Sequence, residues 1–149
     1  MIQRKQTLFL AASVVLFLST FAFPFGTIGM HELHNYKVIS PDGSAVSEIS
    51  TYYFSIPLAI ASLVSAYAIF LYSNRQRQMA VVRISFIFYA ASFALMSLYI
   101  INAVKTIGAE TFQWGVSFFL PFAAFFCNMI ALRGIKKDEQ LVKSLDRLR

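Results

Sequence analysis

The stretch His31-Glu32-Leu33-His34 holds both histidines of the sequence. On a helical turn, imidazoles three residues apart can face one metal ion, and Asp42 or Glu48 can complete its ligand shell. The stretch differs from the zinc-protease motif H-E-x-x-H, in which the histidines lie four residues apart and the glutamate serves as a base. We favour a solvated loop edge here, with His31 and His34 as metal ligands in the alternative interpretation.

Other catalytic chemistry has no matching pattern in the sequence. No apolar segment contains a pair of carboxylates or a nucleophile beside a base. The single cysteine, Cys127, excludes the C-x-x-C of a quinone-linked thiol oxidoreductase, and its place in an apolar run indicates a packed side chain. We therefore predict a protein that is not an enzyme and has no cofactor.

Composition indicates the kind of scaffold that carries these residues. The 149 residues are 58% hydrophobic and 13% charged, whereas roughly a quarter of the residues in soluble proteins are charged. The deficit of charge predicts a membrane protein with a single domain.

Four long apolar segments predict an all-α membrane protein, an antiparallel four-helix transmembrane bundle. About 20 apolar helical residues cross a hydrocarbon core. A signal peptide is the alternative for the first segment, but its apolar run exceeds the usual length and lacks an A-x-A cleavage site. The predicted spans are residues 8–25, 53–72, 81–104 and 112–132, with an outer loop at 26–51 and a tail at 133–149.

Basic residues distinguish the two sides of the predicted bundle. The tail holds six of the thirteen lysines and arginines, and Lys37 and Lys105 are the two on the opposite side. Basic residues collect on the cytoplasmic side of membrane proteins. We therefore predict a multi-pass protein of the bacterial inner membrane with both termini in the cytoplasm. Membrane lipids then account for the positive charge without a nucleic-acid partner.

The outer loop contains a turn signal at Pro41-Asp42-Gly43, where proline fixes φ and glycine accepts a positive φ. Residues 36–40 and 45–49 flank this turn. They predict a small outer-loop hairpin over the mouth of the bundle.

Small residues in the second span predict the face that packs against other helices. Ala61, Ser62, Ser65 and Ala66 recur at a spacing that lets helix backbones approach closely in lipid. We expect Asn128, in the fourth span, to form a buried hydrogen bond between helices. Ionisable residues are missing near the predicted midplane, which argues against a proton- or ion-coupled transporter.

Three prolines, Pro24, Pro57 and Pro121, fall in the outer halves of three spans, where they can kink the helices. Helices splayed in this way would open a pocket for a lipid or an acyl chain. Ordinary packing is the other interpretation, because proline is well tolerated near a helix start.

The tail predicts a separate cytoplasmic amphipathic C-terminal helix beyond a bend at Gly134, with Asp138 as its N-cap. Its apolar stripe runs from Ile135 to Leu148. The helix either lies in the headgroup layer on anionic lipid or docks on a protein partner. The predicted contact residues are basic and apolar side chains of this side of the membrane: Arg75, Arg77, Arg133, Lys136, Lys137, Leu141, Lys143, Leu145, Arg147 and Leu148.

The start MIQRKQT and the end IKKDEQLVKSLDRLR resemble the two ends of an uncharacterised family, a domain of unknown function, of short four-span inner-membrane proteins from Gram-negative bacteria. The resemblance covers the full length in topology. Family members commonly carry an apolar residue at the position of Lys5 and alanine at the positions of Gly134 and Leu145. The resemblance implies the topology and no activity.

These patterns favour a non-enzymatic accessory or scaffold protein of the inner membrane. It would engage a partner protein or anionic lipid through its cytoplasmic basic face and tail. A small transporter or lipid-binding module that uses the proline-kinked outer half is the alternative. The oligomeric state stays open.

Overall fold

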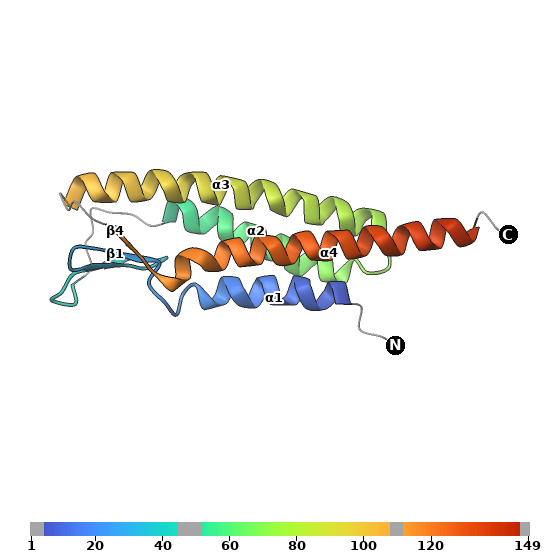
Figure 1. Ribbon diagram of the computed structural model, residues 1–149, viewed down its shortest axis with the longest axis horizontal. Coiled ribbons are helices and arrows are strands. Elements are labelled where there is room, and N and C mark those ends of the chain that lie inside the picture. The colour runs from blue at the N-terminus through green and yellow to red at the C-terminus, as the bar shows by residue number, and fades with distance from the viewer. Residues whose placement is uncertain (1–4, 45–51, 108–111, 147–149) are drawn as a thin grey trace.

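The computed structural model describes residues 5–44, 52–107 and 112–146, with side chains for 5–44, 52–106 and 112–144. Its helices are α1 (Lys5–Ser19), α2 (Tyr52–Phe70), α3 (Arg75–Ile107) and α4 (Val116–Asp146). Its strands are β1 (Gly26–Ile28), β2 (His31–Leu33), β3 (Val38–Ile39) and β4 (Phe112–Trp114) (Figure 1). The prediction of a mostly helical protein with long apolar helices is confirmed.

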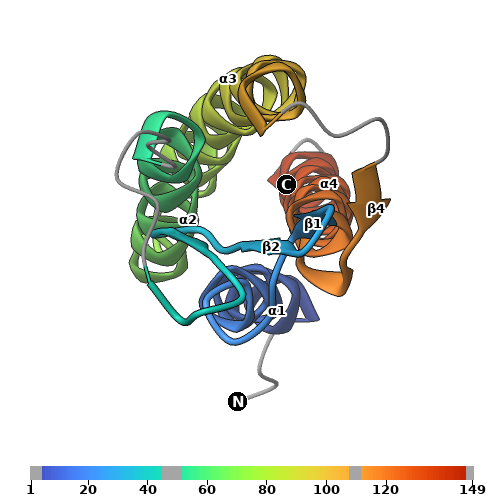
Figure 2. The same ribbon diagram turned by 90° about the vertical axis from the view of Figure 1, so that its left-hand side faces the viewer.

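The four helices lie side by side around a ring in the order α1, α2, α3, α4 (Figure 2). α1 contacts α2 and α4, and α3 contacts the same two helices. Consecutive helices run in opposite directions, so the described ends of the chain lie together at one end of the ring (Figure 1). The small sheet lies at the other end.

Among the described residues, α2, α3 and α4 are long and apolar enough to cross a membrane, and α1 is a shorter apolar helix of 15 residues. The prediction of a first helical span over 8–25 was therefore too long. Turns continue to Ala22, whose N–H donates to the Ser19 carbonyl at 3.1 Å. Phe25 then donates to the Leu33 carbonyl at 2.8 Å, because proline at 24 ends helical bonding and the chain joins the sheet.

The sheet has the order β3-β2-β1-β4, and all its neighbouring strands are antiparallel. β4 pairs Phe112 with Ile28 and Trp114 with Gly26. Starting a helical span at residue 112 was thus wrong, since a short apolar run alone does not separate strand from helix. α4 begins at Val116 instead.

The predicted turn at Pro41-Asp42-Gly43 is present. The Gly43 N–H donates to the Ser40 carbonyl at 2.9 Å, and Gly43 has a φ of +77°. The first arm of the predicted hairpin contains β3, which pairs with β2. Its second arm, 45–49, lies outside the described residues. The single predicted hairpin is therefore part of a larger sheet.

Two glycines allow close contacts where β1 meets β4 and where the start of α4 meets the chain just before β1. A Cβ on Gly115 would lie 2.4 Å from the Pro24 carbonyl oxygen, and one on Gly26 would lie 2.2 Å from the Phe112 ring. These distances are far below van der Waals contact, so a larger residue would force the backbone apart at Gly115.

The interior consists of three apolar clusters along the ring's axis. The cluster under the sheet contains Phe25, Phe54 and Tyr99, and the middle one contains Leu58, Tyr89 and Ala124. The third lies near the described chain ends and is formed by Leu10, Ala68, Val82, Ala131 and Ile135.

The predicted bend at Gly134 is absent, and α4 is unbroken from Val116 to Asp146. Gly134 instead allows α1 to approach, because a Cβ there would lie 2.8 Å from Cγ of Gln6. Ile135 is fully buried in the bundle. The prediction of a separate tail helix capped by Asp138 was therefore wrong, since Asp138 lies inside α4.

Candidate functional site

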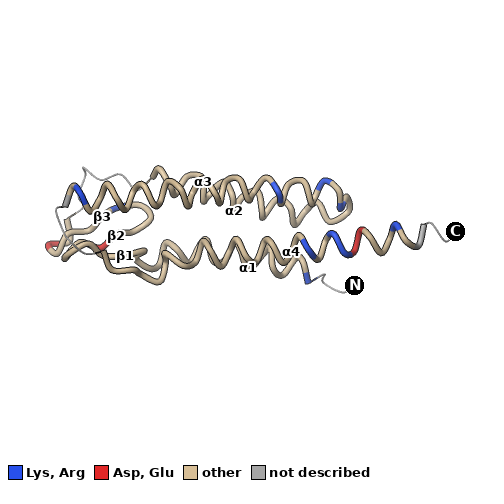
Figure 3. Tube along the Cα trace, turned by 45° about the horizontal axis from the view of Figure 1, so that its top comes forward, with Lys and Arg blue, Asp and Glu red and all other residues tan. Residues whose placement is uncertain are grey.

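Charged residues divide the described structure into three parts (Figure 3). Lysines and arginines gather at the end that carries the described chain ends, and few charges lie at the sheet end. A long stretch of helices without charge separates the two. The basic end is formed by Lys5 of α1, by Arg75, Arg77 and Arg83 of α3, and by Arg133, Lys136, Lys137 and Lys143 of α4.

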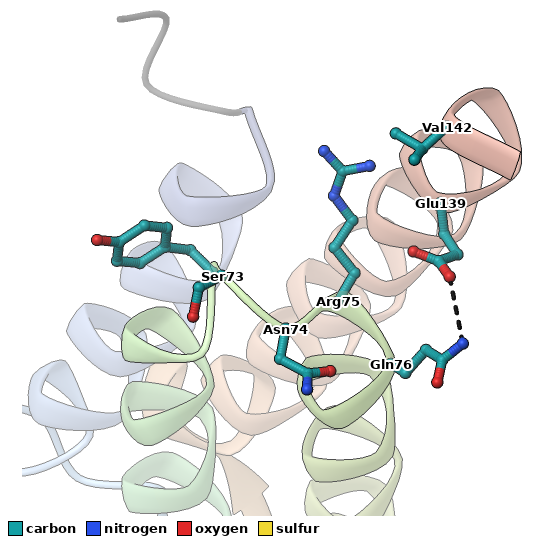
Figure 4. A pocket seen from close by; sticks show the side chains of 7 residues that line it. Ser73, Asn74, Arg75, Gln76, Glu139 and Val142 are labelled. Carbon is teal, nitrogen blue, oxygen red and sulfur yellow. Dashed lines mark hydrogen bonds between the residues drawn. The ribbon is translucent and has the colours of Figure 1, made fainter. Parts of the chain in front are cut away.

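At the basic end, three side chains from other parts of the bundle hold α4. Gln6 Nε2 donates to Oδ2 of Asp138 at 2.6 Å, and Arg75 Nη1 donates to the main-chain carbonyl of Asp138 at 2.9 Å. Gln76 Nε2 donates to Oε1 of Glu139 at 3.4 Å (Figure 4). Position 138 is thus tied to both α1 and the start of α3.

Beyond these bonds, α4 continues as a projecting segment, residues 140–146, which we call the α4 arm. Figure 1 shows it extending past the other helices along their common direction. The side chains of Leu141 and Val142 are 56% and 40% exposed. Lys143 Nζ lies 3.3 Å from Glu139 Oε1, one turn back. The arm therefore presents apolar side chains on a helix whose base is fixed.

Two hollows flank the base of the arm. The first, of about 480 Å³, lies between α4 and the α2–α3 turn and is lined by Tyr72, Ser73, Asn74, Arg75, Gln76, Glu139 and Val142 (Figure 4). The second, of about 510 Å³, lies between α1 and α4. We call it the α1–α4 groove; its lining is Lys5, Gln6, Phe9, Ile130, Arg133, Gly134, Lys137 and Asp138.

A polar cluster in the bundle's interior receives one side chain from every helix. Asn128 of α4 is fully buried; its Nδ2 donates to Ser65 Oγ of α2 at 2.8 Å, and its Oδ1 accepts from Ser13 Oγ of α1 at 3.3 Å. The hydroxyl of Tyr89, from α3, is buried beside these three side chains. The hydrogen bonds of the cluster tie α1, α2 and α4 together.

The predicted packing face of α2 points into the interior. Ala61, Ser62 and Ser65 are buried, and Ala66 is partly buried. Ala61 packs in the middle cluster against Tyr89 and its neighbours.

The prolines at the sheet end lie at or near the ends of the described helices. Pro24 lies outside α1, while Pro57 and Pro121 each fall within the first two turns of their helices. Aromatic side chains fill the space between them, including Phe93 and Phe122, whose stacked rings have centroids 4.3 Å apart.

The two histidines lie on an extended segment, so the expected helical turn is absent. His31 belongs to β2 and its Nδ1 lies 3.3 Å from Ser40 Oγ, whereas His34 follows the strand and its Nε2 lies 3.3 Å from Glu32 Oε2. In the described residues, no three His, Cys, Asp or Glu side chains gather as a metal site. Of the two carboxylates expected to complete the site, Asp42 is exposed in the turn at 41–43 and Glu48 lies outside the described residues.

The structure separates the predicted contact residues into three groups. Arg75 is engaged in holding α4. Exposed side chains belong to Arg77, Arg133, Lys136, Lys137, Leu141 and Lys143. The side chain of Leu145, and all of Arg147 and Leu148, lie outside the described part of the chain. Sequence reasoning missed Gln6 and Gln76, because an isolated glutamine near a helix start gives no signal of a distant partner.

The model of a family described as "Domain of unknown function (DUF4293)" matches residues 2–148. No curated protein matches the chain.

Proposed function

We propose that the chain, which belongs to the DUF4293 family, is a four-span protein of the bacterial inner membrane that acts as a non-enzymatic accessory or scaffold protein. Its α4 arm would dock a partner protein in the cytoplasm.

The distribution of apolar surface supports the membrane placement. Large apolar side chains such as Leu63, Phe70 and Ile87 are more than half exposed on the outside of the helices. In water such an apolar surface would drive association between protein molecules, whereas in a membrane lipid tails cover it without loss of free energy. With its turns to residue 22, the first helical stretch reaches about 27 Å, close to the hydrocarbon thickness of about 30 Å.

The uneven charge supports the orientation. Basic residues at the end that carries both described chain ends favour the cytoplasm for that end. The sheet would then lie on the periplasmic side.

The single observation that carries the docking proposal is the unbroken course of α4. A helix bent at Gly134 would be free to lie flat on lipid, with its apolar stripe in the headgroup layer. The unbroken helix, fixed at Asp138, instead holds Leu141 and Val142 exposed, with Val142 at the hollow beside the α2–α3 turn. Exposed apolar residues on a fixed helix suit the groove of a protein partner.

Site-specific photo-crosslinking in growing cells tests this proposal. A photoreactive phenylalanine analogue replaces Leu141 or Val142 in turn, and the matched control replaces Gln140, which is also exposed. We expect one discrete crosslinked protein from positions 141 and 142 and a much weaker product from position 140. Absence of products, or equal products from all three positions, would contradict the proposal.

A truncation provides a second readout. A chain that ends at Gln140 keeps Ile135, Asp138 and Glu139, which the bundle uses, and removes the apolar side chains of the arm. We expect normal membrane insertion and loss of the same partner on purification in mild detergent. Retention of that partner by the truncated chain would also contradict the proposal.

The alternative of a transporter or lipid-binding module in the sheet-end half gains no support. The described helices there are packed on aromatic rings, and the prolines lie at or near helix ends.

A further inference from the structure

We propose that the α1–α4 groove is a binding site for one anionic phospholipid, whose phosphate lies among Lys5, Arg133 and Lys137. The inference rests on the membrane placement proposed above and is independent of a protein partner on the α4 arm.

The three cations are available for a ligand. Their side chains are exposed, and within the described residues none of them forms an ion pair or a hydrogen bond. The carboxylate of the groove, Asp138, is already engaged, because its Oδ2 accepts the hydrogen bond from Gln6. Three cations and one carboxylate leave an excess of positive charge that suits a phosphate group. An arginine can hold two phosphate oxygens at once.

The order of residues along both helices matches the polarity of a phospholipid. On α1, Phe9 lies one turn deeper in the bundle than Lys5. On α4, Ile130 lies about one turn deeper than Arg133, and its side chain is 45% exposed. One turn is about 5.4 Å, so the groove changes from cationic to apolar over the distance between a headgroup and the first methylenes of its acyl chain.

Gly134 lets the Gln6 side chain form the floor of the groove. It has no side chain between the two helices, and a Cβ there would meet Cγ of Gln6 at 2.8 Å. The groove's volume of about 510 Å³ accommodates a headgroup with part of a chain. Basic pockets between membrane helices on the cytoplasmic side are suited to such headgroups.

Native mass spectrometry of the full chain in a detergent micelle tests the assignment. The probes are phosphatidylglycerol and phosphatidylcholine with identical acyl chains. Arg133→Gln/Lys137→Gln is the test variant, and Arg77→Gln/Lys143→Gln is the control, because it removes the same charge at the same end but outside the groove. We expect a single phosphatidylglycerol to be retained in preference to phosphatidylcholine. Its affinity should fall roughly thirtyfold in the test variant and less than threefold in the control, since each basic residue near an anionic lipid contributes about fivefold.

Two competition experiments distinguish a bound lipid from a bound soluble phosphate. Inorganic phosphate and glycerol 3-phosphate, which share the phosphate but lack acyl chains, should not displace the bound lipid at millimolar concentration. Displacement by either, an equal loss of affinity in test and control variants, or equal retention of the two lipids would overturn the inference.

Carbonate washing of cell membranes separates this inference from the proposed function. Protein that stays in the washed membrane but binds both lipids equally would refute the lipid site alone. Release of the protein by the wash would overturn the membrane placement and the lipid site together.

Discussion

The hydrogen bond between Asn128 and Ser65 should be measurable as a coupling energy between α4 and α2. A double-mutant cycle of Asn128→Ala and Ser65→Ala isolates it, because each single change removes one partner of the 2.8 Å bond. Interhelical hydrogen bonds in membrane proteins contribute about 0.6 kcal/mol on average and at most about 1.7 kcal/mol.

The surroundings of the bond set where in that range the coupling should fall. Asn128 is fully buried, so water does not compete for its amide. However, Ser65 Oγ also donates to the Ala61 carbonyl at 2.8 Å, and this bond remains when Asn128 is replaced. The Ser65 hydroxyl therefore keeps a partner when Asn128 is replaced. When Ser65 is replaced, Asn128 Nδ2 loses its hydrogen bond, so the penalty for an unpaired buried group arises in one of the two single variants only. We expect a coupling of about 1 kcal/mol.

Reversible unfolding of the full chain in mixed micelles, or steric trapping in bicelles, gives the four free energies of unfolding. The control cycle pairs Asn128→Ala with Ser117→Ala. Ser117 bonds the Thr20 carbonyl at 2.9 Å, about 16 Å from Asn128 along α4, and should couple by less than about 0.5 kcal/mol. A coupling near zero for Asn128 and Ser65 would refute the bond, and one above about 3 kcal/mol would refute the reasoning about the remaining partner.

Four further changes test how the elements are held. Gly115→Ala should lower the free energy of unfolding by about 2 kcal/mol or more, because its Cβ would meet the Pro24 carbonyl oxygen at 2.4 Å. Gly134→Ala should cost less stability than Gly115→Ala, because its Cβ would meet a side chain rather than backbone and alanine favours the helix by about 1 kcal/mol; equal losses of stability in thermal unfolding of the two variants would argue against both contacts. Gln6→Ala removes the bond to Asp138, so backbone amides of residues 140–144 should exchange hydrogen faster, and unchanged exchange would show that the bond does not hold the arm. Lys143→Met removes the ion pair of the exposed Lys143 with the partly buried Glu139, which keeps its hydrogen bond from Gln76. The free energy of unfolding should change by less than about 1 kcal/mol, so a larger loss in chemical unfolding would contradict the assigned role.

The helices that the sequence predicts best are those with long, uniformly apolar runs. The second span was predicted at 53–72 and α2 covers Tyr52–Phe70. No competing signal interrupts this run, since its one proline lies near the helix start, where it is tolerated. The third span was predicted at 81–104, but α3 begins at Arg75, because helical bonding continues through polar residues that a hydropathy pattern leaves out.

The parts of the fold that were predicted wrongly depend on pairings between segments that are distant in the sequence. Residues 26–28 and 112–114 form one part of the sheet, and nothing local in either segment indicates the other. Apolar aromatic residues such as Phe112 suit a strand as well as a helix. The tight contacts at Gly26 and Gly115 depend on the same pairing.

In the candidate site, too, the features that depend on local sequence were predicted and those that depend on distant contacts were not. Basic residues at one end followed from the positions of lysine and arginine in the sequence. The unbroken course of α4 could not be predicted from the sequence. Gly134 permits a bend as readily as it permits the close approach of another helix. The presence of Gln6 opposite Gly134 decides between these two roles, and that contact joins residues far apart in the chain.

Spin labels placed one at a time at residues 136–144, in a Cys127→Ala background and in lipid bilayers, test most directly whether the α4 arm projects from the membrane. The reporters are collision rates with a water-soluble relaxing agent and with oxygen, which concentrates in lipid. We predict that labels at residues 140–144 all meet the water-soluble agent, on every side of the helix, and that oxygen collisions stay low. Alternation with a period of about 3.6 residues, with Leu141 and Val142 on the oxygen-rich side, would instead mean that the arm lies flat on lipid and would contradict the proposed docking helix.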